Sequence, residues 1–232
     1  METFAQKILK YHFSLKPDIV LPDHIEWLYP YDISSVRDAM RRFFTKYFSD
    51  YESRTVLLGI NPGRFGAGIT GLPFTDPIRM ETECQLTNDF PKKQELSSVF
   101  VYEFINAIGG PDFFYRNFYI TSICPLGFVK DGKNYNYYDS QHLTDAIMPM
   151  IVDNLQKHIS FGVKTDVAFS MGQGKNFAFL QRINKEYQFF KKLVPLPHPR
   201  WVMQYRLRRK DEFVREYVDK LSNCLPGDLI LD

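Results

Sequence analysis

The sequence predicts an α/β fold: a central, mostly parallel four-stranded sheet with helices on both faces, in a single domain over residues 1–232. Four short apolar runs alternate with longer segments of helical periodicity, a pattern typical of parallel sheets that are buried on both sides. Hydrophobic residues make up 44% and aromatic residues 16% of the 232 residues, enough to build a substantial core. No internal repeat, low-complexity tract or linker divides the chain.

Two helices are expected before the sheet begins, over residues 3–14 and 34–48. The second has Ser34 or Ser35 as its expected N-cap and carries one apolar stripe. That stripe consists of Val36, Met40, Phe43, Phe44 and Phe48. The chain then alternates between strands expected at 55–60, 118–123, 166–171 and 191–196 and helices expected at 95–108, 140–158, 174–187 and 209–223. Gly109-Gly110 should end one of these helices, and Asp139 or Ser140 should cap the next.

The composition indicates which cellular compartment and which cofactors to expect. Cys84, Cys124 and Cys224 are few, scattered and odd in number, which favours reduced thiols over disulfides and excludes a four-thiolate cluster. The five histidines show no metal-ligand spacing. The amino terminus lacks a signal-peptide h-region, and no run of about 18 apolar residues occurs. We therefore expect a cytoplasmic monomer that needs no metal or other cofactor and does not contact membranes.

The formal net charge of +2 conceals an asymmetry. Residues 191–210 contain seven cations and no acidic residue, so the rest of the chain has a formal net charge of −5. The seven cations are Lys191, Lys192, Arg200, Arg206, Arg208, Arg209 and Lys210. One basic surface on an otherwise acidic protein is typical of phosphate binding, although a charged run can also be a solvated helix face.

Polar residues follow the expected strands at one edge of the sheet. Asn61, Ser122, Gly172 and His198 each lie within a residue or two of a strand's carboxyl end. Because the carboxyl ends of parallel strands share one edge, these residues should converge on one crevice, where open α/β sheets bind ligands.

Three short motifs lie at these strand ends. The first, Gly59-Ile60-Asn61-Pro62-Gly63-Arg64-Phe65-Gly66, continues to Thr70-Gly71-Leu72-Pro73-Phe74. Cys124-Pro125-Leu126 follows the second strand, and Leu196-Pro197-His198-Pro199-Arg200 follows the last. In each case a glycine- or proline-shaped loop presents polar groups directly after an apolar strand.

Together, these motifs resemble those of the uracil-DNA glycosylase superfamily, and specifically its single-strand-selective monofunctional family. That family reads Gly-Met-Asn-Pro-Gly-Pro-Phe-Gly and Thr-Gly-Val-Pro-Phe, with His-Pro-Ser-Pro-Arg after the last strand. The resemblance implies a glycosylase that flips uracil out of single-stranded or mispaired DNA and leaves an abasic site for base excision repair. It assigns Asn61 to positioning water, His198 to the departing base and Phe74 to stacking, with Ile60, Gly63 and Ser122 completing the pocket. No lysine is placed for Schiff-base chemistry, so strand cleavage is not expected.

Departures from the family pattern concern base selection. The family reads the uracil edge with an Asn at the position of Ser122, and a hydroxyl cannot offer an amide's donor and acceptor together. Asn134 or Asn136 is a candidate to compensate, unless both are ordinary loop residues. Gly63 should leave space at the C5 atom of the base, which would admit 5-hydroxymethyluracil. Arg64 replaces a family proline.

The segment after the last motif mixes cations with large apolar side chains. Base-flipping enzymes need a wedge for the vacated stack and cations for the phosphates. The wedge candidates are Trp201, Met203 and Tyr205, and the candidate phosphate contacts are Arg200, Arg206, Arg208 and Arg209. The alternative is that this segment forms the first turn of the last helix and packs on the core.

Three other functions fit parts of the pattern. A glycosylase for xanthine or hypoxanthine is favoured by Ser122, which removes the uracil-reading amide. A non-catalytic DNA- or nucleotide-binding module would have no chemical reason to keep both Asn61 and His198. A small-molecule nucleoside hydrolase would not need the acid-free basic segment.

Overall fold

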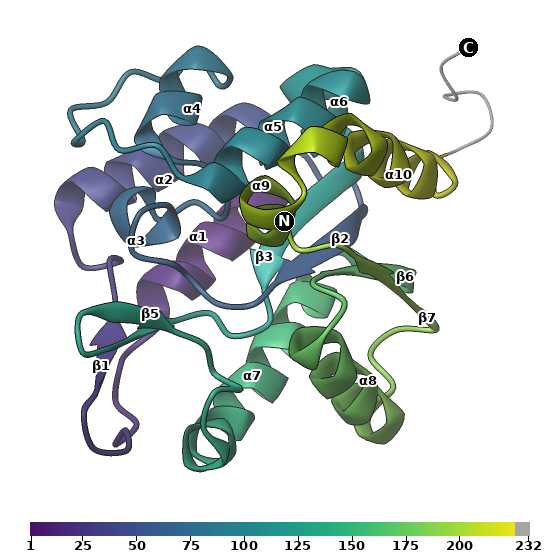
Figure 1. Cartoon of the computed structure of the whole chain (residues 1–232). Coiled ribbons are helices and arrows are strands. Elements are labelled where there is room, and N and C mark those ends of the chain that lie inside the picture. The colour runs from purple at the N-terminus through teal and green to yellow at the C-terminus, as the bar shows by residue number, and fades with distance from the viewer. Residues whose placement is uncertain (226–232) are drawn as a thin grey trace.

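Four parallel strands form the central sheet, in the order β3-β2-β6-β7 (Figure 1). The computed structural model describes residues 1–225, so residues 226–232 of the expected domain lie outside the described part. The strands are β2 (Arg54–Gly59), β3 (Phe118–Ser122), β6 (Val163–Met171) and β7 (Lys192–Leu196). They confirm the predicted parallel sheet, and β2, the strand that leads into the first motif, is buried along its whole length.

Helices cover both faces of this sheet, as predicted. In Figure 1, α7 and α8 lie below the sheet, whereas α2, α5 and α6 lie above it. The longer helices are α1 (Phe4–Ser14), α2 (Ser34–Phe48), α5 (Leu96–Ala107), α6 (Gly110–Asn117), α7 (Gln141–Phe161), α8 (Lys175–Tyr187) and α10 (Lys210–Ser222). Shorter ones are α3 (Ala67–Thr70), α4 (Pro77–Thr82), α9 (Pro199–Tyr205) and the 3-10 helix η1 (Leu207–Arg209).

The predicted helix ends are partly confirmed. The apolar stripe of α2 is buried, but its expected serine cap is wrong: Ser34 is already helical, and Ile33 is the N-cap without a side-chain bond. Ser140 does cap α7, because its hydroxyl accepts a hydrogen bond from the Leu143 N–H (3.4 Å). Gly109, with φ of 118°, follows the end of α5.

The segment after His198 does not belong to the last helix. His198 caps a separate helix, α9, and Pro199 occupies its first position, where a missing N–H costs nothing. Arg206 ends α9 with non-helical dihedral angles (φ −134°, ψ 24°), and α10 begins only at Lys210. The residues predicted as wedge or phosphate contacts thus lie in α9, in the residue that ends it and in η1, and none of them lies in α10.

A second, antiparallel sheet was not predicted. It consists of β1 (Ile25–Leu28), β4 (Gly127–Lys130) and β5 (Lys133–Tyr135), in the order β1-β4-β5. β4 and β5 form a hairpin whose turn residues, Asp131 and Gly132, both have positive φ (50° and 70°), the conformation that Asp-Gly favours. The hairpin carries residues 134–137 to the carboxyl edge of the main sheet.

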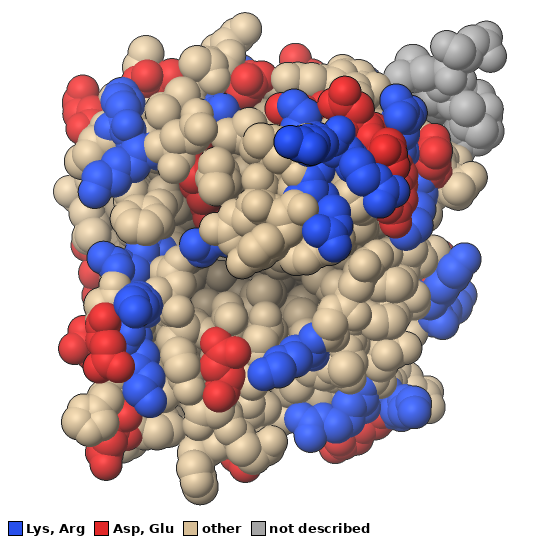
Figure 2. Space-filling model, in the orientation of Figure 1, with Lys and Arg blue, Asp and Glu red and all other residues tan. Residues whose placement is uncertain are grey.

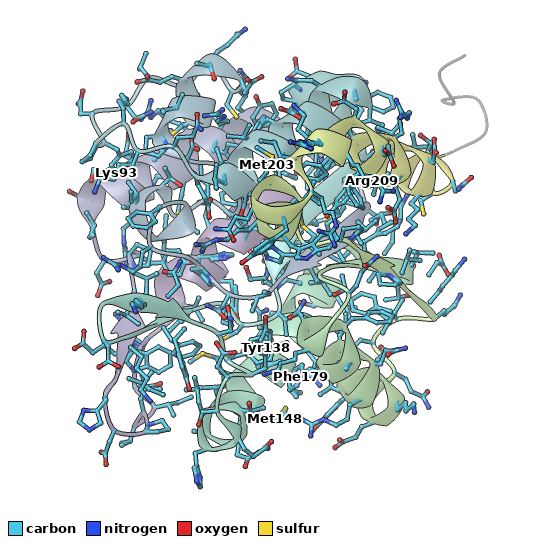
Figure 3. The ribbon with its side chains drawn as sticks, in the orientation of Figure 1. Lys93, Tyr138, Met148, Phe179, Met203 and Arg209 are labelled. Carbon is cyan, nitrogen blue, oxygen red and sulfur yellow. The ribbon has the colours of Figure 1, made fainter. Side chains whose placement is uncertain are left out.

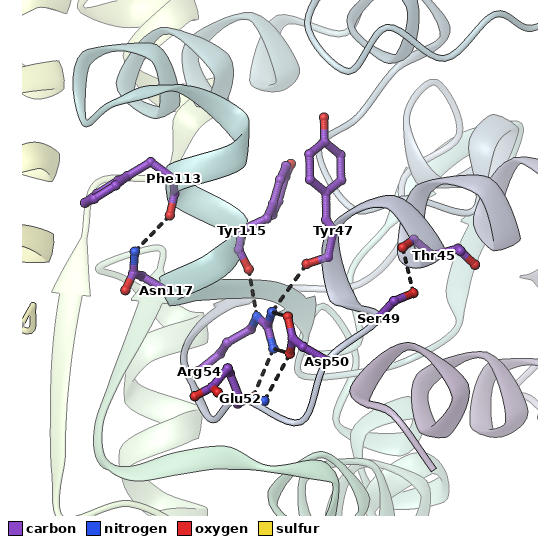
Figure 4. A network of polar contacts seen from close by, with 9 residues as sticks. All are labelled: Thr45, Tyr47, Ser49, Asp50, Glu52, Arg54, Phe113, Tyr115 and Asn117. Atoms are coloured by element: carbon purple, nitrogen blue, oxygen red, sulfur yellow. Dashed lines mark hydrogen bonds and ion pairs between the residues drawn. The ribbon is translucent and has the colours of Figure 1, made fainter.

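Arg54, at the start of β2, forms a buried polar network (Figure 4). Its Nη1 and Nη2 donate to the two carboxylate oxygens of Asp50 (2.8 and 2.6 Å), and its Nε donates to the Tyr115 carbonyl (2.7 Å). Its guanidinium also lies about 5 Å from the rings of Phe4 and Phe48. The network ties the central strand to the carboxyl-terminal ends of α2 and α6.

Removing the Asp50 carboxylate should destabilise the fold strongly, because the buried Arg54 cation would lose its counter-charge. We expect Asp50→Ala to lower the free energy of unfolding by about 3 kcal/mol in urea denaturation. Asp38→Ala is the matched control: it removes an exposed ion pair with Arg42 on α2 and should cost less than about 1 kcal/mol. Equal losses in the two variants would contradict the structural role of Arg54.

Candidate functional site

A cavity of about 560 Å³ opens at the carboxyl edge of the main sheet. Figure 2 shows it as a hollow at the centre of the molecular face, between α9 above and α8 below. Asn61, Gly172 and His198 line it, as the strand ends predicted, and so do Ile60, Gly63 and Phe74. The hairpin and the start of α5 close one side with Asn134, Asn136 and Glu95.

The Asn61 amide is held by main-chain groups on both sides. Its Nδ2 donates to the carbonyls of Pro62 and Tyr135 (3.3 Å each), and its Oδ1 accepts from the Tyr137 N–H (3.2 Å). Both amide hydrogens are therefore engaged, whereas the carbonyl oxygen keeps one lone pair. Asn61 can accept one more hydrogen bond at the cavity surface but has no free donor.

His198 is the N-cap of α9, and this fixes its tautomer. Its Nδ1 accepts a hydrogen bond from the Arg200 N–H (3.1 Å), so the proton of the neutral ring lies on Nε2. Burial, with a smaller effect of the Arg200 charge, lowers the pKa of His198 to about 4. The ring is therefore neutral near pH 7 and can donate from Nε2.

Phe74 stands on a strained backbone at the cavity wall. Its φ of 51° is unusual for a bulky residue, a kind of strain that clusters at functional sites. A Cβ at Gly59 would lie only 3.0 Å from the Phe74 ring, so any other residue there would have to displace the ring by a few tenths of an ångström. The Phe74 and His198 ring centroids are 6.4 Å apart, which places an aromatic face and a hydrogen-bond donor in one cavity.

Ser122 is buried beside Phe74 and does not itself line the cavity. The same ideal Cβ position at Gly59 lies 3.5 Å from the Ser122 hydroxyl. The Ser122 carbonyl accepts from the Asn154 amide (2.9 Å), and the following N–H groups bond to the carbonyls of Gly59 and Ile60 (3.0 Å each). The backbone of this strand end is thus fixed, while the side chain offers only one short hydroxyl.

The wall beside Gly63 is polar. A Cβ added at Gly63 would lie 3.4 Å from Asn134 Nδ2 and 3.8 Å from Glu95 Oε1. Asn134 is oriented because its Oδ1 accepts from the Arg64 N–H (3.0 Å). Asn136 also lines the cavity, but its Nδ2 donates to Asp139 (2.9 Å). The space expected at Gly63 is thus bounded by an amide and a carboxyl group.

Glu95 is a site residue that sequence reasoning missed. Its carboxyl group lines the cavity, and burial raises the pKa of Glu95 to about 7. The Ser98 hydroxyl donates to Oε2 (2.9 Å), and the Glu95 N–H donates to Asp76 (2.8 Å). In the sequence, an acidic residue just before a helix has an ordinary explanation, so no signal distinguished it.

A buried chain of hydrogen bonds links the two loops, and it too was missed. Tyr137, whose N–H bonds Asn61, donates its hydroxyl to Asn176 Oδ1 (2.7 Å). Asn176 donates in turn to Ser170 Oγ (3.2 Å), at the end of β6. Gly172, two residues further on, lies against the His198 ring. The Asn61 and His198 loops are therefore positioned through a common framework.

The three wedge candidates occupy different positions on α9. Trp201 and Tyr205 line the cavity and are 37% and 66% exposed, respectively. Met203 instead packs against the core and is not among the cavity-lining residues. Figure 3 labels Met203 at α9 and, further down the same face, Tyr138, which lines the cavity. Trp201 is braced by the Phe213 ring and by the Arg206 guanidinium, 4.8 Å from its ring centroid.

The basic segment does not form one surface. Lys191 and Lys192 lie at the amino end of β7, a full strand length away from the cavity, because the extended chain separates them. Arg209 and Lys210 are paired with Glu212 (2.7 Å) and Glu103 (2.8 Å). Of the four arginines in residues 199–210, Arg200, Arg206 and Arg208 make no ion pair within the described residues 1–225. Figure 2 shows cations gathered over α9 and α10.

No group of three or more His, Cys, Asp or Glu side chains within residues 1–225 is arranged to hold a metal ion. In the same part of the chain, no helix has the length and apolar character needed to cross a membrane.

Comparison with known proteins identifies the family. The family model of the uracil DNA glycosylase superfamily matches residues 45–222. Among solved structures, the crystal structure of wild-type SMUG2 from Pedobacter heparinus is 42% identical, with a TM-score of 0.93 over 96% of this chain and 98% of that one. The search of curated proteins gave no match. The chain therefore belongs to the uracil-DNA glycosylase superfamily of DNA-repair hydrolases and is similar, within it, to the single-strand-selective monofunctional family.

Proposed function

We propose that this DNA glycosylase hydrolyses the N-glycosidic bond of uracil in single-stranded or mispaired DNA and leaves an abasic site. One observation carries the proposal: Asn61 and His198, from loops more than 130 residues apart, face one cavity with one free acceptor and one free donor. A protein that only bound DNA would not need this pairing. The proposed enzyme acts as a monomer and uses no metal.

His198 stabilises the departing base. Glycosidic cleavage passes through an oxocarbenium-like sugar, and the base leaves with negative charge spread over O2. The Nε2–H of the neutral His198 ring donates to O2, and this bond strengthens as charge develops. Because the pKa of His198 is low, the ring is neutral and has no extra proton to give. The base therefore leaves as an anion that accepts a hydrogen bond from Nε2–H.

Asn61 orients the attacking water. Its remaining Oδ1 lone pair accepts a water hydrogen and turns the water's own lone pair toward the sugar carbon. An amide is a poor base, but water that attacks a nearly free oxocarbenium ion needs orientation more than deprotonation. The three hydrogen bonds that Asn61 makes to main-chain groups hold its amide in one orientation, and the water is oriented by that amide.

The rim of the cavity suits a flipped nucleotide. We assign Tyr205 and Trp201 as the wedge that fills the vacated stack, because both are exposed at the cavity mouth. Arg200, Arg206 and Arg208 bind the flanking phosphates. The extruded base stacks on Phe74 with C5 toward Gly63, where Asn134 and Glu95 would provide partners for the hydroxyl of 5-hydroxymethyluracil.

A second substrate class is favoured by Ser122. With one buried hydroxyl in place of an edge-reading amide, the strand end does not restrict the site to uracil. Xanthine and hypoxanthine are therefore the alternative bases, released by the same Asn61 and His198 chemistry.

Incubation with lesion-containing oligonucleotides tests the function directly. We expect alkali-revealed abasic sites with uracil in single-stranded and mispaired DNA, at an unchanged rate in the presence of EDTA. Parallel substrates carry 5-hydroxymethyluracil, xanthine or hypoxanthine. Complete loss of activity with EDTA would contradict the metal-free mechanism, and absence of any abasic product would favour a binding module.

Replacing His198 should slow base release while DNA binding persists. Loss of one donor aimed at a developing anion costs about 2.7–4 kcal/mol, so His198→Ala should be slower by a few hundredfold in single-turnover assays. His198→Asn keeps an N-cap for α9 and should be similarly slow; recovery of the wild-type rate in it would mean that the cap alone matters. His142→Ala, at an exposed position, is the control.

Neutralising Arg206 should weaken the salt dependence of DNA binding. Each lost phosphate contact reduces the slope of log affinity against log salt by about 0.7 for single strands. We expect this change for Arg206→Gln and none for Lys191→Gln, which lies at the far end of β7 and is paired with Asp166. Equal slopes for wild type and Arg206→Gln would mean that Arg206 contacts no phosphate and is an ordinary solvent-exposed residue.

A further inference from the structure

The chemistry of deamination indicates what the cavity must recognise, if the proposed function holds. Deamination replaces an exocyclic amino group, which donates hydrogen bonds, with a carbonyl group, which accepts them. Uracil differs in this way from cytosine, and hypoxanthine from adenine. A site that selects deaminated bases therefore needs hydrogen-bond donors directed at this carbonyl. The hydroxyl of Ser122 could supply only one.

Asn134 supplies one such donor beside Gly63. Its Oδ1 is occupied by the Arg64 N–H (3.0 Å), so the amide cannot turn its oxygen toward the cavity without losing that bond. Its Nδ2 lies 3.4 Å from the ideal Cβ position of Gly63. The O4 of a pyrimidine and the O6 of a purine both lie next to the C5 atom that the proposed pose directs toward Gly63.

The Glu95 carboxyl group also lies close to the ideal Cβ position of Gly63. Its Oε1 lies 3.8 Å from the ideal Gly63 Cβ, and an added Cβ at Gly66 would overlap its Oε2, so the carboxyl group packs directly against the first motif. Ser98 donates to Oε2 (2.9 Å). When Glu95 carries a proton, that hydrogen bond leaves Oε1 as the oxygen that bears it, and Oε1 becomes a donor toward the cavity.

The surroundings of Glu95 favour the neutral acid up to neutral pH. Burial raises the pKa of Glu95 to about 7; the Ser98 hydrogen bond lowers it, the Asp76 charge raises it, and the Arg200 charge lowers it. Arg79 lies 3.8 Å from Asp76. Besides Glu95 and Arg200, the ionisable side chains that line the cavity are Lys175, His198, Tyr138 and Tyr205. The pKa of His198, about 4, leaves it neutral throughout the range in which Glu95 titrates.

We propose that the Glu95 carboxyl group and the Asn134 amide together read the carbonyl oxygen that deamination creates at O4 of uracil or O6 of hypoxanthine. Two donors at this position accept a carbonyl and reject an amino group, because cytosine or adenine would bring a third donor against them. An ionised Glu95 would instead repel both the carbonyl oxygen and the leaving base. Glu95 and Asn134 thus supply the discrimination that an amide at position 122 would have provided.

The pH dependence of base release tests the role of Glu95. In wild type, the single-turnover rate for uracil should fall as pH rises through about 7, by about tenfold per unit, because the neutral acid is lost. Glu95→Gln keeps a donor at every pH, so this fall should disappear. Glu103→Gln, the same change at a residue of α5 that pairs with Lys210 and does not line the cavity, should keep the wild-type profile. A fall that persists unchanged in Glu95→Gln would overturn the proposal.

A second variant protects the test against misfolding of the first. Ser98→Ala removes the hydrogen bond that lowers the pKa of Glu95, so the fall in rate should move to higher pH. An unmoved profile in a folded Ser98→Ala protein would also overturn the proposal. Asn134→Ala should reduce the preference for uracil over cytosine about tenfold, and an unchanged ratio would exclude Asn134 from the reading group.

Binding separates this inference from the proposed function. Oligonucleotides with 2′-fluorinated nucleotides resist glycosidic cleavage, so affinities for uracil and cytosine, or for hypoxanthine and adenine, can be compared without turnover. The preference for the deaminated base should decrease above pH 7 in wild type and stay constant in Glu95→Gln. A pH-independent preference in wild type would overturn the reading role even if the enzyme cleaves uracil. The predicted behaviour without any cleavage would contradict only the proposed activity.

Discussion

The ion pair between the buried Arg54 and the partly exposed Asp50 is the interaction on which the arrangement of the site depends. Arg54 fixes the start of β2 to the ends of α2 and α6, and β2 is the strand that pairs with both β3 and β6. Asn61 follows two residues after this strand. Because the strand is buried throughout and anchored at its start, its position is fixed, and its carboxyl end places the Asn61 amide at the cavity. Burying a guanidinium is costly, and here its hydrogen bonds to Asp50 and to carbonyl groups offset that cost.

The hydrogen bonds already made also determine what each side chain proposed for the chemistry can still offer. Asn61 uses three bonds on main-chain groups and keeps one lone pair, while His198 uses Nδ1 on the α9 N-cap and keeps Nε2–H. The free atom is in each case determined by the bonds already made. Glu95 follows this rule as well, since Ser98 occupies one carboxyl oxygen. Pre-organised groups of this kind need not reorganise when charge develops, which is the source of their catalytic value.

The sequence predicted the parts of the molecule that depend on local pattern. The four strands, the edge at which Asn61 and His198 meet, and the family followed from apolar runs and short motifs. The small sheet escaped because its strands are only three or four residues long and β1 pairs with a partner about 100 residues away. Glu95 was not predicted because acidic residues are common at the start of helices, and only the tertiary packing shows that this one lies at the cavity. Lys191 was assigned to the basic surface because sequence distance does not reveal that a strand lies between it and Arg200.

The hairpin of β4 and β5 also says something about how such an enzyme can change. The groups proposed for chemistry lie directly after strands of the parallel sheet, where a shift of backbone would disturb the core. Asn134 lies instead on a two-stranded extension that ends in an exposed Asp-Gly turn. Hairpins of this kind tolerate changes of length and sequence. If Asn134 reads the base as proposed, evolution or protein engineering could change the preferred base by exchanging this short surface hairpin, while the residues at the strand ends stay the same.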